Sequence, residues 1–186
     1  MIPTLPLAAR DRLAATILAA FHDPGARARL AALAEGTDIA AWLEPDAHGA
    51  APLAQQRAEA AARAIRPLPL GSTTPSAAEA LERAAVLFDA GLGFEAHEVL
   101  EPLWAAAAGE AREALQGLVQ IAVAFQHRAN GNLAGFRSLL VEGAGRLERG
   151  RLPGLDLAAF ARAARASLSD PGALVPSFPR PARAVR

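Results

Sequence analysis

Prolines and glycines divide this chain of 186 residues into segments of helical length, and this division constrains the fold more than any other feature. The chain holds 14 prolines and 15 glycines, which are residues that stop helices and mark turns. Between them alanine, leucine, arginine and glutamate dominate, and these are among the best helix formers. No segment alternates apolar and polar residues over a useful length, as a half-buried strand would. We therefore predict an all-α fold, a compact antiparallel helical bundle with an N-terminal helical extension.

Breakers and capping residues together predict where each helix lies. Before residue 66, helices are expected over residues 6–21, 24–34 and 53–65, with a short helix inside 37–43 and a loop over 44–52. After residue 74, helices are expected over residues 75–90, 94–107, 110–129, 133–149 and 157–168. The side chains expected to cap helix starts are Thr37 or Asp38, Asn132 and Asp156, because such groups accept hydrogen bonds from free backbone N–H groups.

The domain organisation follows from the stretch "RPLPLGSTTPS", which has three prolines and a glycine and is predicted to be a linker. We expect an N-terminal helical extension over 1–65, a linker over 66–75, a helical core over 76–168 and a tail over 169–186. The tail is rich in proline and arginine and is expected to be extended, either wrapped on the surface or disordered. The linker leaves two subdomains open, although a single bundle with an extension is preferred.

The absent residue types exclude several kinds of chemistry. The chain has no cysteine, no tyrosine and no lysine, so all 19 basic residues are arginine. No thiolate nucleophile, disulfide or iron–sulfur site can form without cysteine, and no Schiff base or phosphate-binding Gly-Lys-Ser/Thr loop can form without lysine. No serine lies in a Gly-x-Ser-x-Gly turn either. We assign no catalytic residue.

Net charge and hydropathy bear on partners and location. The formal net charge is zero, whereas proteins that bind nucleic acids usually carry a basic excess, so no nucleic acid is expected as a partner. No apolar run reaches the length of about 18 residues that a membrane-spanning helix needs. The N-terminal stretch lacks the early positive cluster and the uninterrupted apolar centre of a signal peptide. We expect a cytoplasmic protein with no membrane partner, and we leave open a homodimer.

The unusual chemistry gathers in "FEAHEVLEPLW", residues 94–104. At 100° per residue the apolar side chains fall on one face of this helix. His97, Glu98, Glu101 and Trp104 fall on the other face with Phe94. His97 and Glu101 are four residues apart, so their side chains are neighbours.

The next helix, 110–129, carries a second polar stripe. Its apolar face is predicted to hold Leu115, Leu118, Ala122 and Phe125. The opposite stripe holds Arg112, Gln116, Gln120, Val123 and His127. The connection between the two helices is short, so an antiparallel hairpin is expected. If the two polar stripes face each other, His97 and Glu101 meet the glutamines and His127; the opposite rotation turns both stripes to water.

These stretches resemble the bacterial and archaeal family called domain of unknown function 309, over about residues 80–145. The family pattern is an aromatic residue, His-Glu-x-x-Glu-x-x-Trp, then Gln-Gly-x-x-Gln, a histidine and Gly-Asn-x-x-Gly. The matching positions here are His97, Glu98, Glu101, Trp104, Gln116, Gly117, Gln120, His127, Gly131, Asn132 and Gly135. Phe136 departs from the pattern, which usually has alanine there. The resemblance implies a small helical bundle and no established activity.

Each site residue has a structural alternative. His97 and Glu101 are either metal ligands, with Glu98 as a third ligand or a general base, or a hydrogen-bonded pair that fixes the hairpin, or part of a ligand site without metal; the pair is favoured. Gln116 and Gln120 form either a packed polar network or an amide-lined pocket, because an unpaired buried amide costs about 1–3 kcal/mol.

Arg112 and Trp104 also have both a functional and a structural interpretation. Arg112 binds an anion or, as favoured, pairs with Glu101 or Glu113 or stays solvated. Trp104 is expected to be a packing anchor rather than a ring that stacks on a ligand.

His127 either joins the site or bonds a backbone carbonyl at the helix end. Gly117, Gly131, Asn132 and Gly135 are assigned structural roles, Gly117 as a point of close helix approach and Asn132 as a cap.

Two hypotheses of function follow. The first is a non-catalytic helical module whose polar seam holds the hairpin and binds a small ligand or partner. The second is a metal-assisted hydrolase using His97, Glu98, Glu101 and His127, in which the metal lowers the pKa of a bound water. The metal candidates are His97, Glu101 and His127. No cofactor is preferred, and a divalent transition metal is left open.

Overall fold

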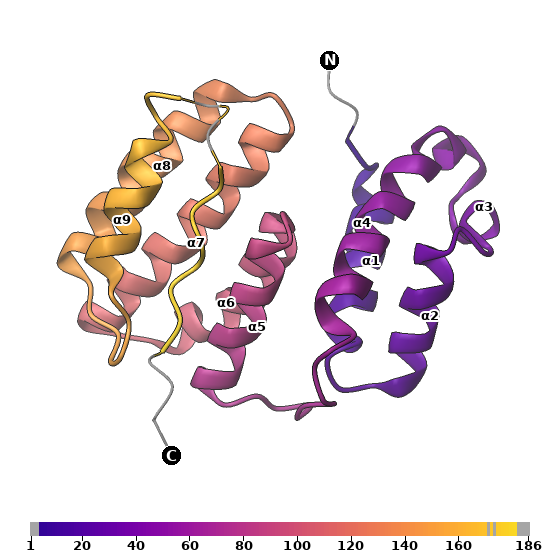
Figure 1. Cartoon of the computed structure of the whole chain (residues 1–186), viewed down its shortest axis with the longest axis horizontal. Coiled ribbons are helices and arrows are strands. Elements are labelled where there is room, and N and C mark those ends of the chain that lie inside the picture. Colours follow the sequence, from indigo (N-terminus) through magenta and orange to yellow (C-terminus); the bar gives the residue numbers. More distant parts are fainter. Residues whose placement is uncertain (1–3, 171, 173, 182–186) are drawn as a thin grey trace. The chain divides into compact units, whose positions relative to one another are not determined.

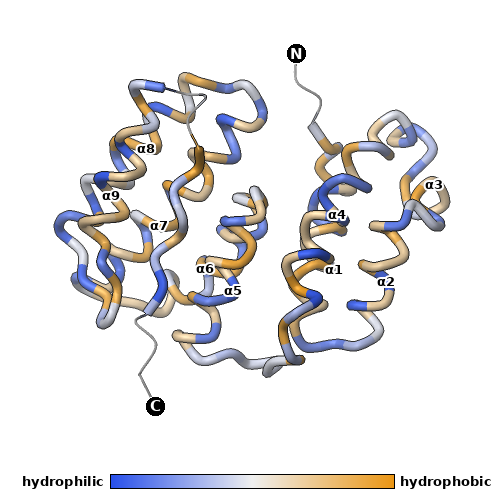
Figure 2. Tube along the Cα trace, in the orientation of Figure 1, coloured by the Kyte–Doolittle hydropathy of each residue, from blue (hydrophilic) through white to orange (hydrophobic). Residues whose placement is uncertain are grey.

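The structure is a computed structural model that describes residues 4–170, 172 and 174–181. These residues form nine α-helices and one 3₁₀ helix, with no strand. The predicted all-α fold is therefore confirmed (Figure 1). Figure 2 shows hydrophobic and hydrophilic residues mixed along the chain trace. In the described residues, no helix is both long enough and apolar enough to cross a membrane.

The chain divides into two compact units, Met1–Pro75 and Ser76–Arg186, with the boundary at the end of the proline-rich segment. The elements of the first unit are α1 (Leu7–Ala19), α2 (Pro24–Ala34), α3 (Ile39–Trp42), the 3₁₀ helix η1 (Pro45–Ala50) and α4 (Ala51–Ile65). Helix α4 packs against α1, α2 and α3. The predicted loop over 44–52 is wrong, because residues 45–50 form η1 and α4 starts directly after it. Pro45 and Pro52 both stand near a helix start, where a missing N–H costs nothing.

The second unit holds the site. Its helices are α5 (Ala77–Asp89), α6 (Gly93–Ala106), α7 (Gly109–Ala129), α8 (Leu133–Arg149) and α9 (Leu157–Ala166). Helix α7 is central, since it packs against both α6 and α8, while α5 packs on α6 and α9 on α8. The four apolar residues predicted for the core face of α7 are all buried: Leu115, Leu118, Ala122 and Phe125.

Capping follows the sequence at the last two helices and departs from it at α3. Asn132 accepts a hydrogen bond from Gly135 N–H at 2.9 Å, and Asp156 accepts one from Ala159 N–H at 2.8 Å. The expected cap at α3 is wrong, because Asp38 makes no side-chain cap and instead takes a left-handed conformation with a φ of 61°. The short side chain of aspartate tolerates that conformation.

Helices α7 and α8 approach closely where two glycines meet. A Cβ atom on Gly117 would lie 2.8 Å from the Gly143 carbonyl oxygen and 2.7 Å from a Leu147 methyl group. A Cβ atom on Gly143 would lie 2.9 Å from the Gly117 carbonyl oxygen. Only glycine at both positions allows this separation of the two backbones.

Part of the C-terminal tail packs on the second unit. Residues 174–181 contain no helix, and Phe178 among them is 2% exposed. The remainder of the predicted 169–186 tail includes 171, 173 and 182–186, which lie outside the described residues. The described part therefore wraps on the surface of its unit.

Candidate binding site on helix α6

Helix α6 carries the polar motif, and a glycine sets its distance from α7. A Cβ atom on Gly93 would lie 2.5 Å from the Ala122 carbonyl oxygen, so only glycine lets the first turn of α6 approach the end of α7. At the other end, Arg112 of α7 contacts Trp104 of α6. The start of each helix therefore lies near the end of the other, and the pair forms the antiparallel hairpin.

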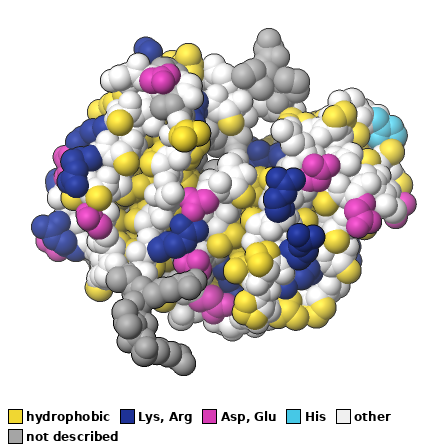
Figure 3. All heavy atoms as spheres, in the orientation of Figure 1, with side chains coloured by type: hydrophobic (Ala, Val, Ile, Leu, Met, Phe, Trp, Pro, Cys, Tyr) yellow, Lys and Arg dark blue, Asp and Glu magenta, His cyan; other side chains and the backbone are white. Residues whose placement is uncertain are grey.

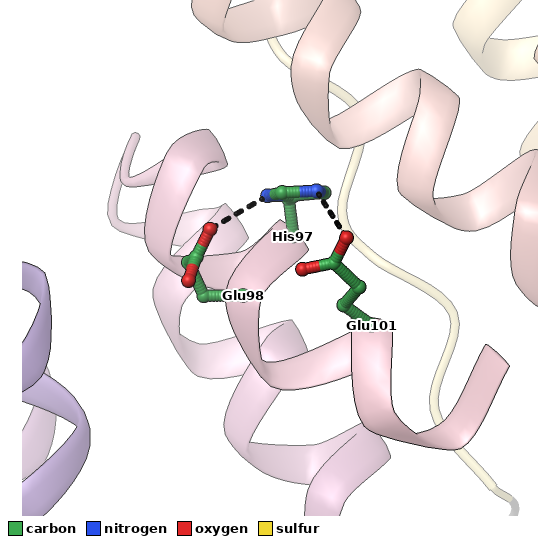
Figure 4. A group of neighbouring side chains, drawn as sticks. All are labelled: His97, Glu98 and Glu101. Carbon is green, nitrogen blue, oxygen red and sulfur yellow. Dashed lines mark ion pairs between the residues drawn. The ribbon is translucent and has the colours of Figure 1, made fainter. Parts of the chain in front are cut away.

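Three polar side chains meet on one face of α6, and we call them the α6 cluster: His97, Glu98 and Glu101. The His97 Nδ1 atom lies 3.2 Å from a Glu98 oxygen, and its Nε2 atom lies 3.9 Å from a Glu101 oxygen. Figure 4 shows the imidazole ring between the two carboxylates, with one ring nitrogen directed to each. One ligand atom from each residue can be chosen so that all three lie within 4.8 Å of one another.

The cluster is accessible without being fully solvated. The side chains of His97, Glu98 and Glu101 are 20%, 35% and 51% exposed, respectively. The His97 ring packs at a tilt against Phe94, with ring centroids 5.9 Å apart. Its Nδ1 atom is buried and, among the described residues, lacks a partner in hydrogen-bonding geometry. The ion pair with Glu98 is thus close in distance but poorly directed.

Helix α6 contains a proline directly after Glu101. Pro102 stands within the helix and has no N–H, so the Glu98 carbonyl loses the donor that residue 102 of a regular helix would supply. The hydrogen bonding of the α6 backbone is therefore interrupted beside the cluster.

Arg112 holds the C-terminal end of α6. Its Nη1 donates to the Trp104 carbonyl at 2.9 Å, with longer contacts to the carbonyls of Ala105 and Ala107. Its guanidinium lies 4.4 Å from the centre of the Trp104 ring, in the range of a cation–π contact. The expected pairing with Glu101 or Glu113 is wrong, because these carbonyls need donors at a helix end and Glu113 pairs with Arg146 at 3.0 Å.

The glutamines of α7 lie half-buried, and Gln120 bonds toward α8. The Gln120 Cβ atom lies 3.1 Å from the position of a Cβ atom on Gly143. Hydrogen bonds from Gln120 and Arg146 lower the pKa of Glu142 on α8, and the bond from Gln120 has the larger effect. This is a contact between α7 and α8 and not one with the cluster. Gln116 is half-buried on the same helix.

His127 lies at the turn between α7 and α8. Its Nδ1 atom is 3.2 Å from the Asn132 amide nitrogen, and its ring abuts Gly135, where a Cβ atom would lie 3.1 Å from the imidazole. Gly131 at this turn has a φ of 75°, a conformation that favours glycine. His127 therefore bonds the capping residue of α8.

The structure thus brings together three of the predicted residues and separates the others. His97, Glu98 and Glu101 form the group that has metal-ligand spacing within the described part of the chain, and His127 is not in it. Trp104 and Arg112 form a second pair at the end of the hairpin. Every hydrogen bond, ion pair and ring contact of His97 that the described residues show stays within α6.

Helix α6 also holds a buried acid, Glu95, that the sequence patterns did not point to. Glu95 is 0% exposed, which is exceptional for a carboxylate. It follows Gly93 by two positions and shares the buried side of the helix with Ala96. Glu95 lies four residues before Val99, so the helical phase that aligns these two side chains was the available signal.

The comparisons with known proteins agree with the resemblance found in the motifs. Residues 81–139 match the family model described as domain of unknown function (DUF309). The match runs from α5 into α8 and includes the α6 cluster, but it covers less than half of the chain. The predicted resemblance is therefore confirmed for this segment. Neither the curated proteins nor the solved structures gave a match.

Proposed function

We propose that this protein is a non-catalytic helical module whose α6 cluster binds a divalent transition metal ion. The observation that carries the proposal is the position of an imidazole and two carboxylates with ligand atoms within 4.8 Å of one another. Imidazole suits transition metals such as Zn²⁺ and Fe²⁺, and carboxylates suit Mn²⁺. Mg²⁺ and Ca²⁺ prefer oxygen ligands throughout, so the mixed set favours a transition metal.

The charges of the cluster support a cationic ligand. In the part of the chain that the structure describes, Glu98 and Glu101 form ion pairs with His97 and with no arginine. Two carboxylates near one imidazole repel each other, and a divalent cation between them removes this repulsion.

The donor count supports binding without catalysis. A metal-assisted hydrolase needs protein ligands for the ion and also a base that takes a proton from the bound water. If all three members of the α6 cluster hold the ion, none is left as the base. His127, the fourth residue of the hydrolase hypothesis, bonds Asn132 instead.

The test is a calorimetric titration of the dialysed full-length chain with MnCl₂ and with ZnCl₂. We expect one ion per chain, and we expect His97→Ala to weaken binding at least about tenfold, because even the loss of a residue that only supports a metal ligand costs about 10–100-fold in affinity. His127→Ala is the matched control and should leave the affinity unchanged, while MgCl₂ should bind more weakly than either metal. Absence of stoichiometric binding, or equal losses in the two histidine variants, would refute the site.

Partners and location stay predictions from the sequence. We propose a cytoplasmic protein that pairs with a second copy, without a nucleic-acid partner. On the face drawn in Figure 3, arginine and acidic side chains lie interspersed, with no large patch of one sign. Leu133 and Val141 on α8 are 42% and 52% exposed and supply apolar surface for a second copy. Sedimentation of the purified chain at two concentrations checks the dimer.

A further inference from the structure

The C-terminal residues 174–181, here called the tail segment, lie beside α5 and α9 and belong to the body of the second unit (Figure 1). The Phe178 ring centroid lies 5.2 Å from that of Phe88 on α5 and 5.5 Å from that of Phe160 on α9. Its backbone N–H donates to an oxygen of Asp89 at 2.8 Å. The tail segment is therefore anchored and forms a wall at the surface of its unit.

Between this wall and α9 lies an open cavity of about 380 Å³, here called the α9 hollow. It is lined by Ala159, Phe160 and Ala163 of α9 and by Pro176 and Pro179 of the tail segment. None of these five side chains has a polar atom. Figure 3 shows hydrophobic side chains grouped where α9 and the tail segment lie. Sites for small molecules have volumes of about 300–1,000 Å³ and mostly apolar linings, so the α9 hollow has the size and the lining of such a site.

The charged groups at the α9 hollow carry an excess of negative charge. Asp156 lines it and is exposed. One of its oxygens accepts the Ala159 N–H at 2.8 Å, and within the described residues no arginine forms an ion pair with Asp156. Arg180 also lines the hollow, but it already pairs with Asp89 at 2.6 Å and with Glu82 at 3.4 Å. Because two carboxylates balance this one guanidinium, the uncompensated charge is that of Asp156 and favours a cation.

We propose that the α9 hollow binds a small aromatic amine, with the ring between α9 and the tail segment and the ammonium group paired with Asp156. An aromatic ring offers a large apolar surface, which gains free energy when alanine and proline side chains cover it. Capping uses one oxygen of Asp156, so the other is available to the ammonium group. The site lies on other elements than the α6 cluster and does not depend on a metal.

The wall of the α9 hollow is also prepared for a ligand. Pro176 and Pro179 have their backbone φ angles fixed by their rings, and Phe178 between them is held by α5 and α9. A site that is already formed loses little conformational entropy on binding. The tail segment therefore stays in place when the ligand enters.

The test is a titration of the ¹⁵N-labelled full-length chain with tryptamine at low salt, followed by nuclear magnetic resonance. The backbone amide signals of Ala159 and Ala163 should shift and reach saturation. Indole-3-propionate has the same ring and a carboxylate in place of the ammonium group. It should bind at least about threefold more weakly, as expected for the difference between attraction and repulsion at an exposed charge.

Three variants localise the binding. Asp156→Asn removes the charge and keeps the cap, since asparagine caps helices as well as aspartate does, and it should weaken tryptamine binding about threefold. Asp23→Asn is the matched control, because Asp23 caps α2 in the first unit by accepting the Gly25 N–H at 2.8 Å, and it should leave the affinity unchanged. Ala163→Leu places a larger side chain in the hollow and should abolish the binding of both compounds.

Three results would overturn the proposal. The first is the absence of saturable shifts on α9. The second is equal affinity for tryptamine and indole-3-propionate, which would show that the charge of Asp156 is not used. The third is equal weakening by Asp156→Asn and Asp23→Asn. If Ala163→Leu loses its helical circular dichroism, the comparison of the two asparagine variants decides by itself.

Discussion

The interface between α7 and α8 and the polar face of α6 come from adjacent parts of one motif, yet their polar side chains bond in opposite ways. At the interface, Arg146 of α8 donates to Glu113 of α7 at 3.0 Å, and a hydrogen bond from Gln120 of α7 lowers the pKa of Glu142 on α8. Gly117 and Gly143 bring the two backbones together. On α6, His97 bonds only within its own helix in the described residues. Contacts between helices hold the helices together, whereas contacts within one helix do not join it to a neighbour. The difference separates a structural region from a candidate site.

The largest effect is expected from Gly117→Ala. Its Cβ atom would lie 2.8 Å from a backbone oxygen, which cannot move aside alone, so overpacking should lower the free energy of unfolding by about 2–3 kcal/mol. Urea denaturation followed by circular dichroism measures the loss. Gly49→Ala is the control, because nothing lies within 4 Å of its Cβ position. Equal stability of the two variants would show that α7 and α8 do not pack this closely.

Arg112→Ala tests what holds the α6–α7 hairpin. The change removes the hydrogen bond to the Trp104 carbonyl and the contact with its ring, and it should cost about 1–2 kcal/mol of unfolding free energy. Arg112→Lys should recover only part of this loss, since an ammonium group does not span several carbonyls and the ring face together. A negligible loss in Arg112→Ala would show that these contacts do not stabilise the hairpin.

His97→Ala tests whether the α6 cluster contributes to the stability of the fold. Because the contacts of His97 stay within α6 among the described residues, the unfolding free energy of the metal-free protein should fall by less than about 1 kcal/mol. The favoured interpretation of the sequence, a His–Glu pair that fixes the hairpin, requires a larger loss. Thermal melting in the presence of a chelator distinguishes the two. A loss equal to that of Gly117→Ala would make the cluster structural.

The smallest expected effect is on how the free energy of unfolding depends on pH, through Glu142. Hydrogen bonds from Gln120 and Arg146 hold the pKa of Glu142 below 4.5, its ordinary value. A carboxylate whose pKa is lowered in the folded state contributes stability above the unfolded pKa, and this stability is lost as the pH falls through the folded value. Glu142→Gln should therefore make the unfolding free energy less dependent on pH between about pH 6 and pH 3. An unchanged pH profile would mean that these bonds are too exposed to contribute.

The chain's local sequence predicted most of the helices and much of the capping. The predicted spans 24–34 and 133–149 coincide with α2 and α8, and Asn132 and Asp156 cap as expected. Both features depend on residues within a few positions of each other, so the sequence contains their causes. The proximity of His97 to Glu101 has the same origin, because four residues make about one helical turn.

Only the tertiary structure decided how the helices are rotated against one another. Helical phase relates side chains about one axis but leaves open which neighbour each stripe faces. Gln120 therefore contacts α8. Arg112 donates hydrogen bonds to carbonyls of α6 and does not pair with an acid. The docking of Phe178 between α5 and α9 joins residues about 90 positions apart, which no local pattern encodes. The sequence determined the helices and the members of the α6 cluster, and packing determined which polar groups are bonded across the fold and which are bonded only within one helix.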